Sequence, residues 1–187
     1  MEKVRDSVKG PIVMVTILLG VMWGLELVDF VVMGHLDRYG IVPRSWDGLW
    51  GILWSPWLHG NFAHLAANTG PFFVLGILVA LRGRRDFVLA TASIMFLGGM
   101  GVWLTGATHS VHIGASGLIF GYFGYLLTIG LVEKSFTGLL VTGLVIVLYG
   151  GIIWGVLPTR IGVSWQGHLF GLLAGIWAGR QFGRKGG

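Results

Sequence analysis

The sequence predicts an all-α membrane protein, a bundle of six transmembrane helices. Of its 187 residues, 54% are hydrophobic and only 11% are charged, whereas an ordinary soluble domain has about 25% charged residues. The mean hydropathy is +0.78. Six apolar stretches are each long enough to cross about 30 Å of hydrocarbon at about 1.5 Å of rise per residue. We therefore expect a polytopic bundle, with an interfacial amphipathic loop between its first two helices.

The expected helices follow one another with short connections. They cover residues 11–33, 60–81, 87–106, 114–131, 136–157 and 163–182. The first stretch is too long for the core of a signal peptide and lacks a small-residue cleavage site, so we expect a retained helix. The short connections 82–86 and 133–135 make the helices they join antiparallel neighbours. We expect a single domain over residues 1–187.

The distribution of Lys and Arg predicts the topology. With the N-terminus in the cytoplasm, ten of the thirteen basic residues fall on the inner side, namely Lys3, Arg5, Lys9, Arg82, Arg84, Arg85, Lys134, Arg180, Arg184 and Lys185. The outer side holds Arg38, Arg44 and Arg160. Positive charge gathers on cytoplasmic loops, so both termini are expected in the cytoplasm and the protein in the inner or plasma membrane, surrounded by lipid. The basic residues are thus topology signals and not a nucleic-acid site.

Segment 34–59 is too polar to span a membrane yet rich in tryptophan. Four tryptophans recur at the spacing of one helical face, Trp46, Trp50, Trp54 and Trp57. Because tryptophan prefers the headgroup level, one interpretation is a short amphipathic helix in the outer interface, ending near Pro56. Packing of these rings onto the bundle is an equally good interpretation.

Polar side chains gather at one depth of the expected bundle. The second, fourth and sixth helices begin with HGNFAHLAANT, HIGASGLIFGYFG and WQGHLFGLLAG, and all three begin on the outer side. Ser116 and His168 therefore lie at a similar shallow depth, together with His59, His64 and Asn68. Polar groups in membrane segments are costly and indicate function, so this layer is the candidate active site.

Glycine spacing predicts that the fourth and sixth helices touch. The sixth has a glycine at every fourth position, Gly167, Gly171, Gly175 and Gly179, and the fourth has Gly117, Gly121 and Gly124. Such small-residue ridges let helix backbones approach closely in lipid. Ser116 lies beside the top of one ridge and His168 beside the top of the other. If the ridges pack together, a hydroxyl and an imidazole meet near the outer surface.

A serine beside a histidine is suited to nucleophilic acyl transfer, in which the imidazole takes the hydroxyl proton and returns it to the leaving group. His64 and Asn68 lie on one face of their helix and are candidate oxyanion donors, as is the Ser116 N–H at the open end of its helix. No acidic residue occurs in these motifs, which indicates a Ser–His dyad. The chain has no cysteine, so a thiol nucleophile is excluded, and the chemistry calls for no metal or cofactor.

These residues resemble the rhomboid family of intramembrane serine proteases, in its minimal six-helix bacterial form. The resemblance rests on three motifs: G-x-S-G at 114–117, H-x4-H-x3-N at 59–68, and G-H-x-x-G at 167–171. The stretch GIVPR at 40–44 is also similar to many bacterial members. The resemblance covers essentially the whole chain.

The resemblance implies a role for each residue. Ser116 is the nucleophile, His168 the general base and acid, and His64, Asn68 and the Ser116 N–H form the oxyanion hole. Close packing around the site falls to the residues Gly114, Gly117, Phe120 and Gly171. Phe120 stands where many members have a tyrosine that stacks on the catalytic histidine. Helix 136–157 and the loop 158–164 are the mobile gate and cap, and the substrates are single-pass transmembrane proteins cut near the outer face.

Two alternatives to the protease stay open. The histidines His59, His109 and His112 offer imidazole ligands for a metal-dependent membrane enzyme or transporter. A non-catalytic rhomboid-like protein that binds transmembrane helices is the other alternative. Glu26 and Asp29, three residues apart in the first helix, serve either a proton or gating role or, more simply, face the outer interface or a polar interior of the bundle.

Overall fold

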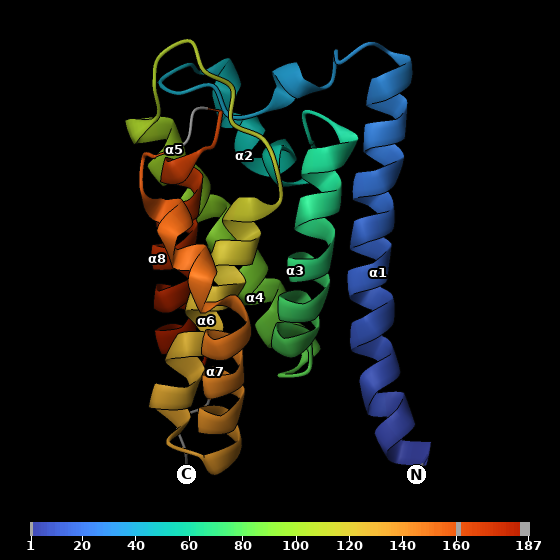
Figure 1. Cartoon of the computed structure of the whole chain (residues 1–187), viewed down its shortest axis with the longest axis vertical. Helices are drawn as coiled ribbons and strands as arrows, with labels where there is room; N and C mark the ends of the chain where they lie inside the picture. Colours follow the sequence, from blue (N-terminus) through green and yellow to red (C-terminus); the bar gives the residue numbers. More distant parts are fainter. Residues whose placement is uncertain (1, 160–161, 184–187) are drawn as a thin grey trace.

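The computed structural model describes residues 2–159 and 162–183 and is an upright bundle of helices (Figure 1). The predicted positions of Arg160, Arg184 and Lys185 lie outside the described residues. The long elements are α1 (Glu2–Val31), α3 (Phe62–Ala80), α4 (Arg84–Ser93), α5 (Gly99–Thr105), α6 (Ser116–Glu133), α7 (Phe136–Tyr149) and α8 (Trp165–Phe182). Two irregular turns complete them: the π-helical η4 (Ile94–Gly98), which joins α4 to α5, and the 3₁₀-helical η5 (Gly150–Val156), which follows α7. The all-α polytopic fold is confirmed.

Two of the six expected spans have different ends in the structure. The first helix starts at Glu2 and not at residue 11, so the charged N-terminal segment is helical. The fifth expected helix, 136–157, ends as an α-helix at Tyr149 and continues as 3₁₀ turns from Gly150. The consecutive glycines Gly150 and Gly151 explain this change, because glycine disfavours the α-helix.

Five helical segments are long and apolar enough to cross a membrane: Val8–Val31, Phe62–Ala80, Arg84–Thr105, Ser116–Glu133 and Phe136–Val156. The remaining long helix, α8, lies beside α6 along its length (Figure 1). Its sequence WQGHLFGLLAGIWAGRQF mixes polar residues and glycines with the apolar ones. It lies in the bundle through packing against α6 and not through an apolar surface of its own.

The glycine ridges bring α6 and α8 into backbone contact, as their spacing predicts. A side chain at Gly171 would overlap the carbonyl of Gly117, and one at Gly175 would overlap the carbonyl of Gly121. Only residues without a Cβ allow this approach. The contact fixes the relative height of the two helices, and therefore of the functional groups at their N-terminal ends.

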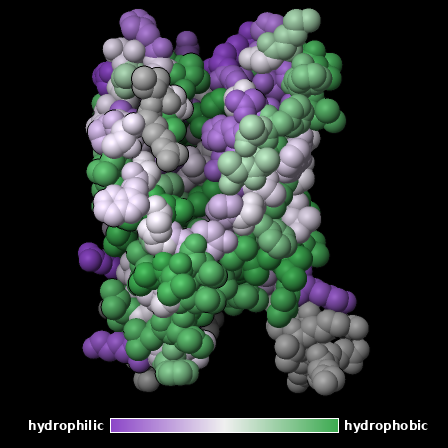
Figure 2. Space-filling view, in the orientation of Figure 1, coloured by the Kyte–Doolittle hydropathy of each residue, from purple (hydrophilic) through white to green (hydrophobic). Residues whose placement is uncertain are grey.

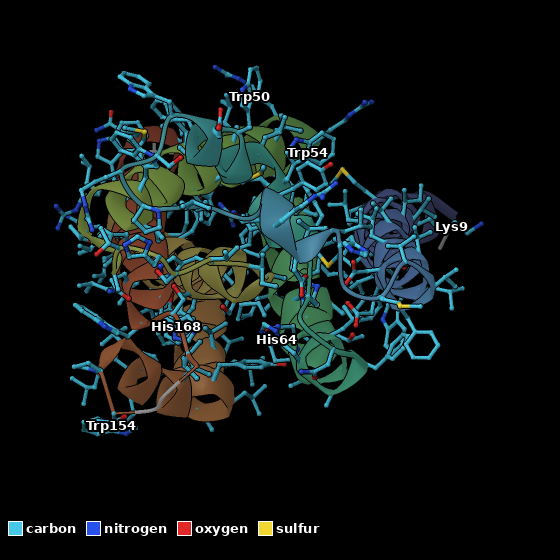
Figure 3. The ribbon with its side chains drawn as sticks, turned by 90° about the horizontal axis from the view of Figure 1, so that it is seen from above. Lys9, Trp50, Trp54, His64, Trp154 and His168 are labelled. Atoms are coloured by element: carbon cyan, nitrogen blue, oxygen red, sulfur yellow. The ribbon has the colours of Figure 1, made fainter. Side chains whose placement is uncertain are left out.

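The tryptophan-rich loop is a series of short turns, so the prediction of one continuous amphipathic helix is wrong in detail. It contains η1 (Asp37–Tyr39), η2 (Asp47–Leu49), α2 (Gly51–Trp54) and η3 (Ser55–Trp57). Three of its four rings nevertheless face outward: Trp46 is 82% exposed, Trp50 72% and Trp54 47%. Trp57 is partly buried and packs against the core. Figure 3 shows the labelled Trp50 and Trp54 pointing away from the bundle. This favours contact with the membrane interface over packing on the bundle.

The two acids in the second half of α1 face the protein. Glu26 and Asp29 are buried, and Asp29 accepts a hydrogen bond from the Leu36 N–H at 2.7 Å. That bond holds the chain where it leaves α1 for the loop. The structure thus gives Asp29 a structural role, as the simpler interpretation expects.

The surface is mostly apolar over its lower half, and polar side chains gather at its upper end and project at its lower sides (Figure 2). The start of α1 and the end of α8 lie at one end, together with the basic residues Lys9, Arg82, Arg84, Arg85, Lys134 and Arg180. The opposite end, which we call the loop end, contains Arg38 and Arg44, and α6 begins below it, inside the bundle. This distribution of apolar and polar surface is that of a multi-pass membrane protein.

Candidate active site

Ser116 is the first residue of α6, which begins inside the bundle below the loop end (Figure 1). A tight turn precedes it: Gly114 has a φ of +113°, which a side chain would make strained, and its N–H donates to the Ser55 carbonyl at 2.8 Å. The first N–H groups of an α-helix have no partner within the helix. The turn therefore presents the Ser116 hydroxyl together with free backbone donors.

His168 lies in the first turn of α8 and is only 8% exposed. Its Nδ1 lies 2.8 Å from the Gly155 carbonyl oxygen, in η5. Since a carbonyl only accepts, Nδ1 carries the proton and Nε2 is left with a lone pair. The ring is thus in the tautomer that a general base needs, held by a backbone carbonyl where serine proteases with a triad use a carboxylate.

Phe120 of α6 contacts His168 of α8 one helical turn after Ser116. Phe120 follows Ser116 by one helical turn and so lies on the same face of α6. Its ring stacks on the imidazole with centroids 4.1 Å apart and planes at 4°. The backbone contact of Gly117 with Gly171 joins the first turn of α6 to the turn of α8 that follows His168. Within the described residues, the Ser116 hydroxyl and His168 Nε2 form no hydrogen bond, either with each other or with another group, so both remain available for chemistry.

His64 and Asn68 reach the same region from α3. A Cβ at Gly114 would lie 2.7 Å from Cε1 and 3.0 Å from Nε2 of His64, so the imidazole lies directly against the turn that precedes Ser116. Asn68 is buried, and its amide donates to the His64 carbonyl at 3.1 Å. One of its two N–H groups is thus used within α3, and the other is free to bind an oxyanion. Viewed from above, His64 and His168 both lie among the helices (Figure 3).

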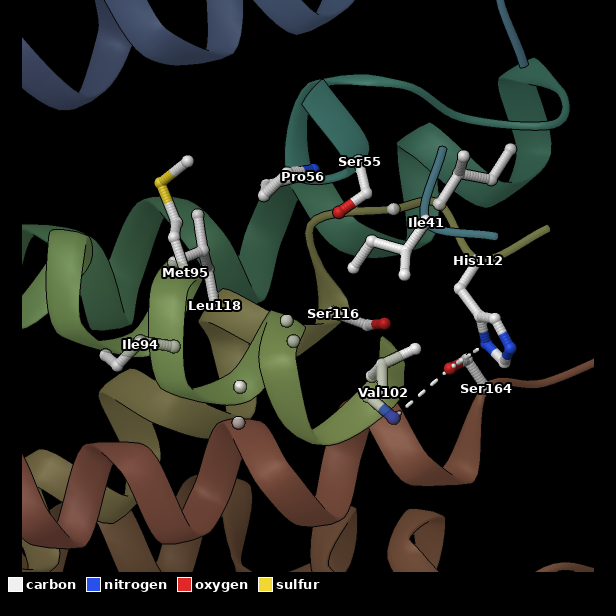
Figure 4. Close-up of a pocket in the computed structure, with 17 residues that line it drawn as sticks. Ile41, Ser55, Pro56, Ile94, Met95, Val102, His112, Ser116, Leu118 and Ser164 are labelled. Carbon is white, nitrogen blue, oxygen red and sulfur yellow. Dashed lines mark hydrogen bonds between the residues drawn. The ribbon is translucent and has the colours of Figure 1, made fainter. Parts of the chain in front are cut away.

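A small cavity of about 50 Å³ opens beside the serine (Figure 4). That is enough room for a water molecule. Ser116, His112 and Ser164 give it polar walls, while the π turn η4 lines it with Ile94, Met95 and Gly98. Figure 4 shows the Ser116 hydroxyl pointing into this space, with His112 and Ser164 on its far side. Inserted π turns often occur at functional sites, and this one widens the helix beside the serine.

Several contacts at the site have no clear signal in the sequence. Gly155 orients His168 from a segment that the periodicity predicts to be ordinary helix. His59 accepts a hydrogen bond from the Ala115 N–H at 3.3 Å, so it supports the serine turn. Burial, followed by the nearby charge of His64, lowers the pKa of His59 to about 4 and keeps it a neutral acceptor.

The N-caps of α3 and α8, in contrast, have a signal in the sequence. Asn61 accepts a hydrogen bond from the His64 N–H and Ser164 from the Gly167 N–H, and both are residue types typical of N-caps.

The histidines do not gather as a metal site. His112 uses both ring nitrogens in hydrogen bonds to serines, and His59 bonds the backbone of the serine turn. His109 is exposed. In the parts of the chain that the structure describes, no three His, Cys, Asp or Glu side chains are grouped to hold a metal ion.

The fold and the site define a polytopic helical membrane protein with a serine and a histidine at one end of two closely packed helices. A model of the Rhomboid domain matches residues 47–185. The chain therefore belongs to the rhomboid family of intramembrane proteases.

The chain is also similar to curated proteins over most of its length. It is 45% identical to an uncharacterised protein of Mycobacterium tuberculosis over 168 residues, which is 86% of this chain and 70% of that protein. An uncharacterised protein of Mycobacterium leprae is 43% identical over 88% of this chain and 69% of its own length. Rhomboid protease GluP of Bacillus subtilis is 30% identical over 82% of this chain and 29% of GluP.

Proposed function

We propose that this protein is a serine endopeptidase that cuts transmembrane proteins near the outer membrane face, with Ser116 as nucleophile and His168 as general base and acid. The observation that supports it best is the arrangement of His168. Its Nδ1–H is bound by Gly155 and its face by Phe120. The proposal requires that the lone pair of Nε2, opposite the Nδ1–H, faces the neighbouring first turn of α6, where Ser116 begins the helix.

The reaction proceeds in two halves. Nε2 of His168 takes the hydroxyl proton as Ser116 Oγ attacks the scissile carbonyl carbon, and the protonated imidazole then gives that proton to the departing amine. The resulting acyl ester is hydrolysed when His168 takes a proton from water, whose oxygen attacks the ester carbon, and returns it to Oγ. In both halves the carbonyl oxygen becomes negative. Its stabilisation is assigned to the Ser116 N–H, His64 and Asn68.

The position of the site suits a substrate that is itself a membrane helix. Ser116 begins a helix long and apolar enough to span a membrane, and this helix starts inside the bundle on the side of the loop end. A peptide bond within a helix is shielded by its hydrogen bonds, and the substrate must therefore unwind before attack. Entry is assigned to the side covered by α7 and η5. α7 is mostly exposed in the bundle.

The charge distribution supports an outward-facing site in a plasma or inner membrane. Among the described residues, six basic side chains lie toward the end that holds the N-terminus, and Arg38 and Arg44 lie at the loop end. Positive charge is enriched on the cytoplasmic side. The termini are therefore assigned to the cytoplasm and Ser116 to the outer face.

The test is cleavage of a single-pass transmembrane protein by the purified protein in detergent and in liposomes. Ser116→Ala and His168→Ala should each abolish cleavage, while Ser93→Ala and His35→Ala serve as matched controls at positions away from the site. Cleavage by Ser116→Ala would overturn the assignment of the nucleophile. A fluorophosphonate probe gives an independent readout: wild type should be labelled and Ser116→Ala should not. If wild type is neither labelled nor active on several substrates, the non-catalytic, helix-binding function replaces this proposal.

A further inference from the structure

We propose that His112 is a positioning residue for the dyad: through hydrogen bonds to Ser110 and Ser164 it ties the loop of the nucleophile to the N-terminus of the helix of the base. This inference rests on the proposed function. It assigns a role in the reaction to a histidine that does not touch Ser116 or His168 through any described hydrogen bond.

The backbone of His112 is fixed first. Its N–H donates to the Ile41 carbonyl at 2.9 Å, and its carbonyl accepts from the Ile41 N–H at 3.0 Å. This isolated bridge joins the first loop to the loop that enters α6. His112 therefore has a fixed place four residues before Ser116.

The imidazole continues the connection to α8. Its Nδ1 lies 2.7 Å from Ser164 Oγ, and its Nε2 lies 2.8 Å from Ser110 Oγ (Figure 4 shows the first contact). Ser164 is the N-cap of α8, and its Oγ also accepts the Gly167 N–H at 3.2 Å. The next residue along the helix is His168. A displacement of His112 would thus move or release the turn that holds the general base.

The donor and the acceptor of each hydrogen bond of the His112 side chain can be assigned. Ser110 Oγ donates to the Ala107 carbonyl at 2.6 Å, so its only hydrogen is committed. It can then only accept from His112, and Nε2 must carry the imidazole proton. Nδ1 is left as the acceptor, and the Ser164 hydroxyl donates to it. Burial lowers the pKa of His112 and so favours this neutral form.

The surroundings leave room for an imidazole at this position. A Cβ at Gly106 would lie 2.8 Å from His112 Nε2, so the absence of a side chain there makes space for the ring. His112 and Ser164 also line the cavity into which Ser116 points. The hydrogen bonds of His112 therefore lie in the wall of the site and not in the remote core.

Three substitutions separate the hydrogen bond from His112 to Ser164 from the one to Ser110. His112→Phe keeps a planar ring and loses both hydrogen bonds. His112→Asn places an amide oxygen near Nδ1 and keeps the bond to Ser164, whereas His112→Gln places an amide nitrogen near Nε2 and keeps the bond to Ser110. We expect kcat for cleavage of a transmembrane substrate to fall about tenfold or more in His112→Phe, with KM nearly unchanged, because small misplacement of catalytic groups is costly. His112→Asn should recover more of kcat than His112→Gln.

The control is His109→Asn, which removes an exposed imidazole from the same loop at a position where φ is +67°, a conformation that Asn tolerates. It should leave kcat unchanged. Wild-type kcat in His112→Phe, or better recovery by Gln than by Asn, would overturn the proposal. Hydrogen exchange of the Gly167 amide is a readout independent of activity: it should be faster in His112→Phe and not in His112→Asn. If wild type cuts nothing, the proposed function fails. Unchanged hydrogen exchange of the Gly167 amide in His112→Phe would separately refute the connection of His112 to α8.

Discussion

Phe120 and His168 lie face to face, with their ring centroids 4.1 Å apart and their planes within 4° of parallel. This contact fixes the plane of the imidazole, and the hydrogen bond from Nδ1 to the Gly155 carbonyl fixes its rotation within that plane. Two uncharged contacts thus orient the ring without a carboxylate. A buried carboxylate would be costly at this depth, which is a physical reason for a dyad.

The first prediction concerns the stacked ring. Phe120→Leu should lower kcat about tenfold, because the imidazole loses the flat surface that holds its plane. Phe123→Leu is the matched control, since Phe123 is equally buried on α6 and belongs to the general core. Both variants should lose similar stability in thermal unfolding, while only Phe120→Leu should lose activity beyond that. Equal activity of the two variants would show that the stack does not orient His168.

The second prediction concerns the residue whose carbonyl binds His168. A Cβ at Gly155 would lie 2.7 Å from Phe120 Cζ and 3.1 Å from His168 Nδ1. Gly155→Ala should therefore push both rings aside and lower kcat by about tenfold or more. Gly151→Ala, in the same η5 segment, has open space around its Cβ and should remain active. Cleavage rates of the two purified variants decide this, and equal rates would contradict the assigned role of η5.

The sequence was sufficient to predict the helices that pack together. The glycine spacing in 117–124 and 167–179 predicts the contact of α6 with α8, and the structure confirms it at Gly117 and Gly171. The reason is physical: a regular ridge of small residues encodes both the contact and its height along the helix. Ser116 directly precedes Gly117 and His168 lies three residues before Gly171, so the same spacing predicts that the ends of the two helices that carry them lie close together.

Contacts that depend on irregular backbone could not be predicted in this way. The π turn at 94–98 lies within an evenly apolar sequence, and nothing in the spacing marks the extra residue. Gly155 contributes a carbonyl, which every residue has, so its identity does not indicate a partner. His112 occurs in the same motif as Ser116, but its bond to Ser164 connects residues that are 52 apart and depends on how α8 begins.

The third prediction concerns pH and His59. Its pKa of about 4 lies below the ordinary histidine value of about 6.5, so the unfolded chain binds more protons between these two pH values. The stabilisation should be fully present above about pH 6.5. The thermal midpoint of unfolding should fall by several degrees as the pH is lowered toward 4. His59→Gln keeps an acceptor for the Ala115 N–H without titrating, and it should flatten this pH dependence. His35→Gln, at an exposed position, should leave the pH dependence of stability unchanged. A His59→Gln variant as acid-sensitive as wild type would contradict the assignment of this pH dependence to His59.

The fourth prediction concerns the contact on which the site depends. A methyl group at Gly175 would overlap the Gly121 carbonyl, so Gly175→Ala must force α6 and α8 apart. Overpacking of this kind costs about 1–3 kcal/mol, and the thermal midpoint in detergent should fall accordingly. Gly143→Ala adds the same methyl group to α7 where the surrounding space is open, and it should leave the midpoint unchanged or raise it slightly. Because Ser116 and His168 lie at the ends of the two separated helices, Gly175→Ala should also lower kcat at temperatures where it remains folded. Full activity with an unchanged midpoint would mean that the helices tolerate a wider separation and that the dyad is held by the loops alone.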